Sequence, residues 1–311
     1  VSAKQVTSHC SIITSVREEY ASRWVSRARA FFDEKVPKNV PKKVVYPFAG
    51  ADLSTALTVY PDADEITTLS LVPAGDPRTL AVLKGAALED ALGKVRYELR
   101  FLYRANFSNT LNMIEAMRGG ALPTQLIFGL SALALHGFEL VSLRYFSLEK
   151  DGAIHYLDAA DLTKAPNPAK GSAEQRNYIF SNCEVQFQKP GGRVQVWRHI
   201  RANLGKNTSK GIGPGLKDDA RVVKHLESKG QIAAMTKAAS YLLSWDTFSI
   251  IRDYLVNHVV WMVSDATGVA PKWGKSAGFE YETYGAFEAP HIPAGTGIGN
   301  SWKAEFAAQP V

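Results

Sequence analysis

The segment from Val44 to Val72 constrains the fold more than any other part of the chain. Val44-Val-Tyr46 has the composition of a short buried strand, and Ile66–Val72 is again rich in β-branched residues. A helix is expected between them, from about Leu53 to Val59. Strand, turn, helix and strand in this order are typical of a βαβ unit, in which a right-handed crossover joins two parallel strands.

Further elements are predicted from the spacing of apolar residues along the rest of the chain. Helices are expected at Ser11–Phe32, from Pro77 toward Arg104, and at Thr124–His136, Asp218–Ser228, Ile232–Leu243 and Asp246 to about Val263. Hairpins are expected from Glu139–Leu148 with Ala153–Leu157 and from Tyr178–Gln188 with Arg193–Asn203, and a last strand at Phe279–Tyr284.

The predicted fold is therefore α/β, a mixed sheet flanked by helices. Its N-terminal βαβ unit is expected to be Rossmann-like or methyltransferase-like, with the hairpins added to it. We expect one domain over residues 1–311, with a helical N-terminal extension at 1–36 and an irregular C-terminal tail at 286–311.

Composition excludes two classes of protein. The longest apolar-rich run, Leu126–Leu135, is far shorter than the roughly 18 residues that a membrane-spanning helix needs, so a soluble protein with no transmembrane segment is expected. The net charge of +6 is a weak field for 311 residues, so no nucleic-acid partner is expected. Two lysine clusters, around Val36–Pro41 and around Gly205–Gly215, are typical of solvated loops.

The cysteines and the start of the sequence bear on the cellular compartment of the protein. Cys10 and Cys183 can form one disulfide in an oxidising compartment or be two unrelated thiols. The sequence starts at Val1 without a basic or apolar leader, which fits a mature exported chain or a trimmed one. We expect a periplasmic or secreted protein, with a cytoplasmic location as the alternative.

The βαβ unit is also where a nucleotide or S-adenosylmethionine would bind, at the carboxyl end of the first strand. The turn there, Phe48-Ala-Gly-Ala-Asp52, has one glycine where the dinucleotide fingerprint has three. The second strand ends in Leu71-Val-Pro73 and lacks the acidic residue that holds ribose hydroxyls. Both halves of the cofactor signal are degraded, so the cofactor stays unknown.

The segment Tyr46-Pro-Phe-Ala-Gly-Ala-Asp52, followed by a helix and Pro61-Asp-Ala-Asp64, resembles an uncharacterised bacterial family. Its members carry a Tyr-Pro-Phe-Ser-Gly-Pro-Asp-like motif, are often exported and are distantly methyltransferase-like. Scattered matches continue over residues 40 to 290, at Lys237–Tyr241, Phe248-Ser249, Arg252, Asp265 and Gly268. The chain departs from the family at Leu71-Val-Pro73, where members tend to have an acidic Leu-Glu-Pro. The resemblance implies no activity.

Metal and catalytic motifs are weak. His258 and Met262, four residues apart on a predicted helix with Asp265 beyond, would suit copper, but a Met on an apolar face usually fills the core. Ser8-His-Cys10 is a lesser candidate near the terminus. Gly129-Leu-Ser-Ala132 lacks the second glycine of a nucleophile elbow, and Gly205–Gly215 lacks the order of a phosphate-binding loop. Neither a catalytic residue nor a metal ligand is therefore assigned.

Polar side chains in apolar segments are the better candidates for a site. The residues predicted to bind a small ligand are Tyr46, Phe48, Gly50, Asp52, Lys237, Tyr241 and Arg252. Asp52 and Arg252 can pair and orient a ligand at the strand ends, although a structural ion pair or a helix cap is the simpler alternative.

Three functions remain open at this point. The first is an exported binding protein for an unidentified small ligand, using the cleft near Asp52. The second is a methyltransferase-like enzyme that uses S-adenosylmethionine with a degenerate cofactor loop. The third is a structural domain that binds a partner through an exposed apolar patch. The oligomeric state is not predicted.

Overall fold

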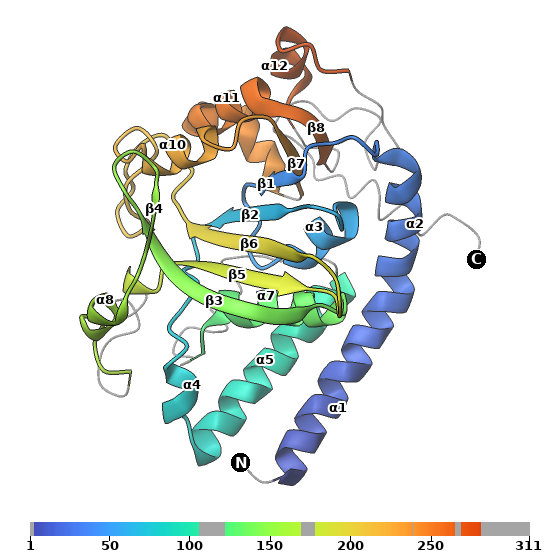
Figure 1. Ribbon diagram of the computed structural model, residues 1–311, viewed down its shortest axis with the longest axis vertical. Helices are drawn as coiled ribbons and strands as arrows, with labels where there is room; N and C mark the ends of the chain where they lie inside the picture. The colour runs from blue at the N-terminus through green and yellow to red at the C-terminus, as the bar shows by residue number, and fades with distance from the viewer. Residues whose placement is uncertain (1–2, 106–121, 169–177, 238, 265–268, 281–311) are drawn as a thin grey trace.

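The computed structural model (Figure 1) describes residues 3–105, 122–168, 178–237, 239–264 and 269–280. It is an α/β structure in which helices flank one mixed eight-stranded sheet, as predicted. The strands are β1 (Lys43–Tyr46), β2 (Glu65–Ser70), β3 (Glu139–Leu148), β4 (Ile154–Tyr156), β5 (Asn182–Gln188), β6 (Val194–Arg201), β7 (Ile232–Thr236) and β8 (Val259–Ser264).

The strand order is β4-β3-β5-β6-β2-β1-β7-β8. Strands β6, β2, β1, β7 and β8 run parallel, whereas β5, β3 and β4 extend the sheet by antiparallel pairing. In the centre, Val45 of β1 lies opposite Thr67 of β2 on one side and Ala234 of β7 on the other. The chain passes from β1 to β2 on one side and reaches β7 later on the other, so the strand order reverses between β1 and β7.

The predicted βαβ unit is confirmed. Helix α3 (Leu53–Val59) connects β1 to the parallel strand β2, and its bounds are those that the sequence predicts. The other helices are α1 (Ala3–Tyr20), α2 (Ser26–Lys35), α4 (Thr79–Val82), α5 (Gly85–Ala105), α7 (Thr124–Leu135), α8 (Ala159–Thr163), α10 (Arg221–Glu227), α11 (Ser249–His258) and α12 (Pro271–Ser276). In the described part of the chain no helix is both long and apolar enough to cross a membrane.

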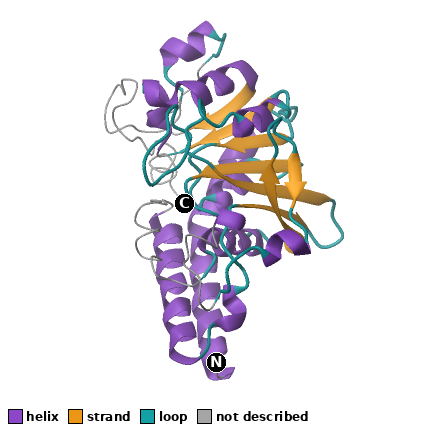
Figure 2. Ribbon diagram, turned by 90° about the vertical axis from the view of Figure 1, so that its left-hand side faces the viewer, coloured by secondary structure: helices purple, strands orange, loops and turns teal. Residues whose placement is uncertain are grey.

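Each face of the sheet is covered by its own apolar cluster, because successive side chains of a strand point to opposite faces. Val44 and Tyr46 of β1 belong to the larger cluster, which α1, α2, α3, α5 and α7 complete. Val45 belongs to the second cluster, which α10 and α11 cover. Figures 1 and 2 show α1 and α5 side by side, extending away from the sheet toward the N-terminus.

The N-terminal helix is longer than the predicted Ser11–Phe32. It runs from α1 through a π-helical segment, Ala21–Val25, into α2. Its buried side chains, which include Trp24, Ala28 and Phe32, form part of the larger apolar cluster. The helix therefore covers the sheet along one edge of the core.

The predictions for the last third of the chain are partly wrong. The predicted helix Ile232–Leu243 is the strand β7 followed by a 3-10 helix, Ala239–Ser244. All five residues of β7 are buried, so it reads as a continuous short apolar run, which periodicity cannot distinguish from a buried helix. The predicted helix Asp246–Val263 ends at His258, and the β-branched stretch that follows is β8.

One further predicted helix is interrupted, and one predicted strand lies mostly outside the described residues. The helix predicted from Pro77 toward Arg104 is interrupted between α4 and α5, where Leu83 is extended and Gly85 has a φ of 53°. Most of the predicted strand Phe279–Tyr284 and the tail at 286–311 lie outside the described residues.

A glycine in α7 shows how closely the helix layer approaches the sheet. A Cβ at Gly129 would lie 1.9 Å from the ring of the buried Trp197 on β6. We expect Gly129→Ala to lower the free energy of unfolding by about 1–3 kcal/mol, because the overpacked indole cannot move aside cheaply. The matched control is Gly93→Ala in α5, where the nearest atom is a flexible Arg96 nitrogen at 3.6 Å. Chemical denaturation should show the control unchanged or stabilised by up to about 1 kcal/mol. Equal effects in both variants would contradict the close approach.

Candidate functional site

The loop that follows β1 has an unusual backbone. Phe48 has a φ of 55° and is the one non-glycine residue with positive φ in the described part of the chain; Gly50 follows at 54°. This left-handed region is costly for a bulky side chain. The loop ends at Asp52, whose side chain accepts a hydrogen bond from the backbone N–H of Thr55 and so caps α3.

The carboxylate of Asp52 is buried and fully hydrogen-bonded. Its Oδ1 accepts bonds from the backbone N–H of Thr55 at 3.2 Å and from the Thr55 hydroxyl at 2.8 Å. Its Oδ2 accepts bonds from the Tyr46 hydroxyl at 3.1 Å and from Nζ of Lys237 at 2.7 Å. Since a carboxylate has about four acceptor positions, Asp52 has none left for another molecule. It can fix the loop, but it cannot bind a ligand without a rearrangement.

Lys237 supplies the positive charge of this cluster. It directly follows β7, so parallel pairing with β1 brings its ammonium to the loop after β1. Besides Asp52 it donates to the Thr55 hydroxyl at 3.0 Å, and it lies 5.8 Å from the centre of the Trp24 ring. The side chains of Lys237 and Asp52 are 3% and 4% exposed. The ion pair therefore lies where the strand order reverses, sealed from solvent.

The pairing of Asp52 with Arg252 that the sequence suggests is wrong, and Lys237 takes that place. Arg252 is buried in α11, where its Nη1 donates to the backbone carbonyls of Leu243 at 2.6 Å and Trp245 at 3.0 Å. Its guanidinium stacks on Trp273, 3.9 Å from the ring centre. Arg252 thus closes the end of the preceding 3-10 helix and holds α12 against α11.

Aromatic side chains from the N-terminal helix cover the ion pair. Tyr20 stacks on Trp24 with ring centres 5.5 Å apart and on Tyr103 of α5 at 4.7 Å. Burial, with the charge of Asp52 as a smaller contribution, raises the pKa of Tyr20 well above its ordinary value. Sequence reasoning missed Tyr20 and Trp24 as site residues, since their spacing indicates only an apolar helix face.

The other predicted ligand-binding residues lie around this loop. The ring of Phe48 is half-buried and meets Phe248, at the start of α11, edge to face at 5.1 Å. The carbonyl of Gly50 accepts a hydrogen bond from the side chain of Gln125. Tyr241 lies in the 3-10 helix after β7, and its side chain is outside the described residues. The structure therefore brings Tyr46, Phe48, Gly50, Asp52 and Lys237 together.

At the end of β2, side chains of the protein already bond to the backbone carbonyls. Nε2–H of the buried His199 donates to the carbonyl of Val72 at 2.7 Å, and Nδ1 of the same ring lies 3.2 Å from the Thr68 hydroxyl. Arg201 donates to the carbonyl of Leu71 at 3.2 Å. The position where a dinucleotide-binding protein has an acidic side chain is thus apolar, with its carbonyls already bonded.

The fold does not bring the candidate metal ligands together. His258 ends α11 and Met262 lies on β8, so the two are not on one helix face. His258 bonds to the carbonyl of Tyr254, and Met262 accepts a long contact from the Thr236 hydroxyl. Asp265 is outside the described residues. No group of three or more potential metal ligands is present among the residues that the structure describes.

Two further sequence features have a structural place. The glycine-rich loop Gly205–Gly215 is held by internal bonds, such as those from Thr208 to Asp218, and Lys206 pairs with Asp246. Cys10 is exposed on α1 and Cys183 is buried in β5, and neither forms a disulfide. The thiols give no support for an oxidising compartment.

The backbone strain at Phe48 can be measured with two matched variants. Phe48→Ala and Phe48→Gly both remove the ring and differ only in a Cβ at a φ of 55°. We expect the glycine variant to be more stable by about 1 kcal/mol, because only glycine adopts this conformation without steric cost. Urea unfolding of both variants gives the difference. If the alanine variant is as stable as the glycine variant, the loop is not strained at this position.

Comparison with known proteins adds no relative. No protein-family model, no curated protein and no solved structure matches this chain. The resemblance to a bacterial family with a Tyr-Pro-Phe-Ser-Gly-Pro-Asp-like motif therefore stays a prediction.

Proposed function

We propose that the protein binds a small ligand at the carboxyl edge of the sheet, beside the loop that follows β1. The observation that carries the proposal is the left-handed Phe48, a strained residue where the strand order reverses. Open α/β sheets bind ligands at such a reversal, and strained residues concentrate at functional sites. The side chain of Phe48 is partly exposed, so it can contact a ligand.

In this proposal Asp52 and Lys237 are positioning residues. Their buried ion pair ties the loop after β1 to the end of β7, and Tyr46 and Thr55 complete its hydrogen bonds. A site with a fixed backbone loses less entropy when a ligand binds. The contacts to the ligand come from Phe48 and from the backbone around it.

A second function, S-adenosylmethionine-dependent methyl transfer, is supported by the strand order alone. In the parallel part of the sheet, β6-β2-β1-β7-β8, the strand order reverses between β1 and β7, as it does in dinucleotide-binding folds. Against it stand the single glycine of the loop and the apolar end of β2, which leave the ribose and the methionine moiety without their usual partners. This function therefore ranks behind the binding protein.

A thermal-shift screen separates the two candidates. The purified chain is melted with S-adenosylhomocysteine, S-adenosylmethionine, nucleotides, divalent metals and a panel of small metabolites. A ligand that binds the folded state stabilises it by about 2.7 kcal/mol at a hundredfold excess over its Kd, and this stabilisation raises the melting temperature. A shift with S-adenosylhomocysteine supports the methyltransferase, a shift with another compound supports the binding protein, and no shift with any compound counts against both.

The resemblance to an often exported family suggests that binding takes place in the periplasm or outside the cell. Fractionation of cells that express the natural protein tests this location. Recovery of the chain with cytoplasmic markers would contradict it.

A further inference from the structure

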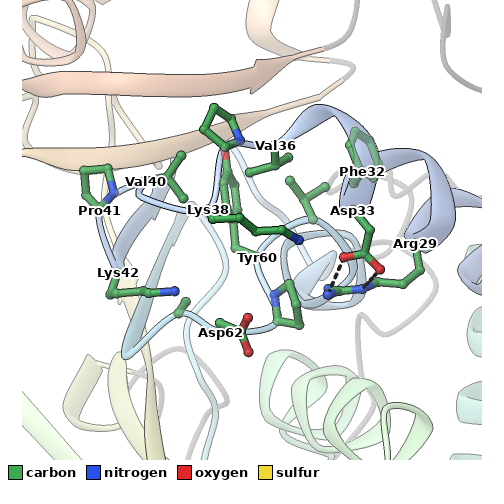
Figure 3. A pocket seen from close by; sticks show the side chains of 14 residues that line it. Arg29, Phe32, Asp33, Val36, Lys38, Val40, Pro41, Lys42, Tyr60 and Asp62 are labelled. Atoms are coloured by element: carbon green, nitrogen blue, oxygen red, sulfur yellow. Dashed lines mark hydrogen bonds and ion pairs between the residues drawn. The ribbon is translucent and has the colours of Figure 1, made fainter.

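A hollow at the opposite edge of the sheet, beside the amino end of β1, is independent of the proposed site. It lies between α2, the linker Val36–Pro41 and the turn Val59–Ala63 (Figure 3). Its floor is apolar, with Phe32 and Tyr60 buried beneath it. Three prolines restrict the backbone around it: Pro37, Pro41 and Pro61. The shape of the hollow is therefore largely fixed before a ligand binds.

The charged groups on the rim are unevenly paired. The carboxylate of Asp33 is neutralised by Arg29, with contacts of 2.7 and 3.1 Å, and Arg29 also donates to the carbonyl of Thr58. In contrast, Lys38 and Lys42 have no carboxylate oxygen within 4.0 Å in the described part of the chain. Figure 3 shows Lys38 extending over the hollow and Lys42 pointing into it from the other side. Two unpaired ammonium groups thus face one small space.

We propose that this hollow binds a small anion, a carboxylate or a phosphate group, between Lys38 and Lys42. The space is about 60 Å³, whereas a cavity needs roughly 10–15 Å³ of such space to hold one water molecule. It is therefore large enough for a single carboxylate or phosphate group. The apolar floor strengthens the attraction, because it keeps water away from one side of the anion.

The carboxylate of Asp62 should oppose anion binding in the hollow, so its removal should have the opposite effect to the removal of a lysine. It lies on the same rim and has no ion pair in the described part of the chain. An anion in the hollow is repelled by Asp62 and attracted by the two lysines. Removing the negative charge must tighten binding, whereas removing either positive charge must weaken it.

The test is a titration of the intact chain with inorganic phosphate and, separately, acetate at constant ionic strength, followed by the amide chemical shifts of residues 36–43. We expect Lys38→Met or Lys42→Met to weaken binding about fivefold and Asp62→Asn to tighten it about fivefold, the effect of one close charge in a solvated site. The matched control is Lys35→Met, which removes a nearby lysine that is paired with Glu34 and does not line the hollow.

Each outcome decides the proposal. Localised shifts that follow this order of variants support it, and the anion that binds more tightly names the group. Binding of neither anion overturns it, as does binding that Lys35→Met weakens as much as Lys42→Met does. Lys38, Lys42 and Asp62 are exposed and Lys35 is partly exposed, so the substitutions leave the core intact.

Discussion

The free energy of unfolding is expected to fall by up to about 4 kcal/mol for each pH unit between roughly pH 6 and pH 4.5, at a slope of 1.36 kcal/mol for each proton. Three histidines cause this loss. Burial is the main reason that the pKa of each of them is lowered to about 4: His136 at the end of α7, His199 on β6 and His225 on α10. Smaller contributions come from Lys189 at His136 and from Lys229 and Arg198 at His225.

The direction follows from proton counting. In this pH range the unfolded chain protonates its histidines near their ordinary pKa of 6.5, while the folded chain keeps all three neutral. The unfolded state binds more protons. The stability that the three neutral histidines contribute is therefore fully present above about pH 6.5 and is lost as the pH falls toward 4. Below that, Glu65 adds to the loss: burial alone would raise its pKa, but Lys229 and Arg198 hold it at about 2.

Urea denaturation between pH 7.5 and pH 4.5 measures this slope. His136→Gln should reduce it by about a third, to roughly 2.7 kcal/mol per pH unit, because one of the three protons is removed. His155→Gln is the matched control, since the ring of His155 is about half exposed. A wild-type slope below that of a single proton would show that these rings are not buried as described.

Breaking the ion pair between Asp52 and Lys237 has the second large effect. We expect Lys237→Met to lower the free energy of unfolding by about 3–5 kcal/mol, because it leaves the charge of Asp52 buried without its counter-ion. Asp52→Leu should cost a similar amount, including about 1 kcal/mol for the lost cap of α3. Both side chains are at most 4% exposed, so water cannot replace the missing partner.

The double variant shows whether the two charges act as a pair. Asp52→Leu combined with Lys237→Met should be far less unstable than the sum of the single variants, since two apolar side chains can replace a buried ion pair at little cost. The control is Lys206→Met, whose partner Asp246 is 84% exposed, and whose loss should stay below about 1 kcal/mol. Additive losses at Asp52 and Lys237 would mean that the two side chains are not coupled.

The first part of the fold was predictable because local signals agree there. Asp52 caps α3, Leu53–Val59 is helical, and the strands on either side contain Val and Thr. The hairpin around Gly152 was likewise readable from its Asp-Gly turn. In these segments propensity, turn chemistry and final structure point the same way.

The site was only half predictable, for a physical reason. Lys237 was recognised as a polar residue in an apolar segment, but β7 was predicted to be a helix, so its pairing with β1 was not foreseen. Its alanines and methionine favour helices locally, and only burial between β1 and β8 makes them a strand. Arg252 was assigned the role of Lys237 because sequence alone does not show which cation reaches Asp52.

The positive φ of Phe48 could not be read from the sequence either. A phenylalanine does not favour this conformation, so the residue type gives no warning. The bonds that hold the loop come from distant parts of the chain, namely Lys237, Gln125 and the carbonyl of Leu69, which accepts from the amide of Ala49.

The measurement that tests the central claim most directly is the metabolite thermal-shift panel, run in parallel on the wild-type chain and on Phe48→Gly. The glycine variant can adopt the same φ of 55° without steric cost, and it lacks the ring that is proposed to contact the ligand. The proposal predicts at least one compound that raises the melting temperature of the wild type and shifts the variant much less. A panel that leaves the wild type unchanged, or shifts both chains equally, would contradict a ligand site at Phe48.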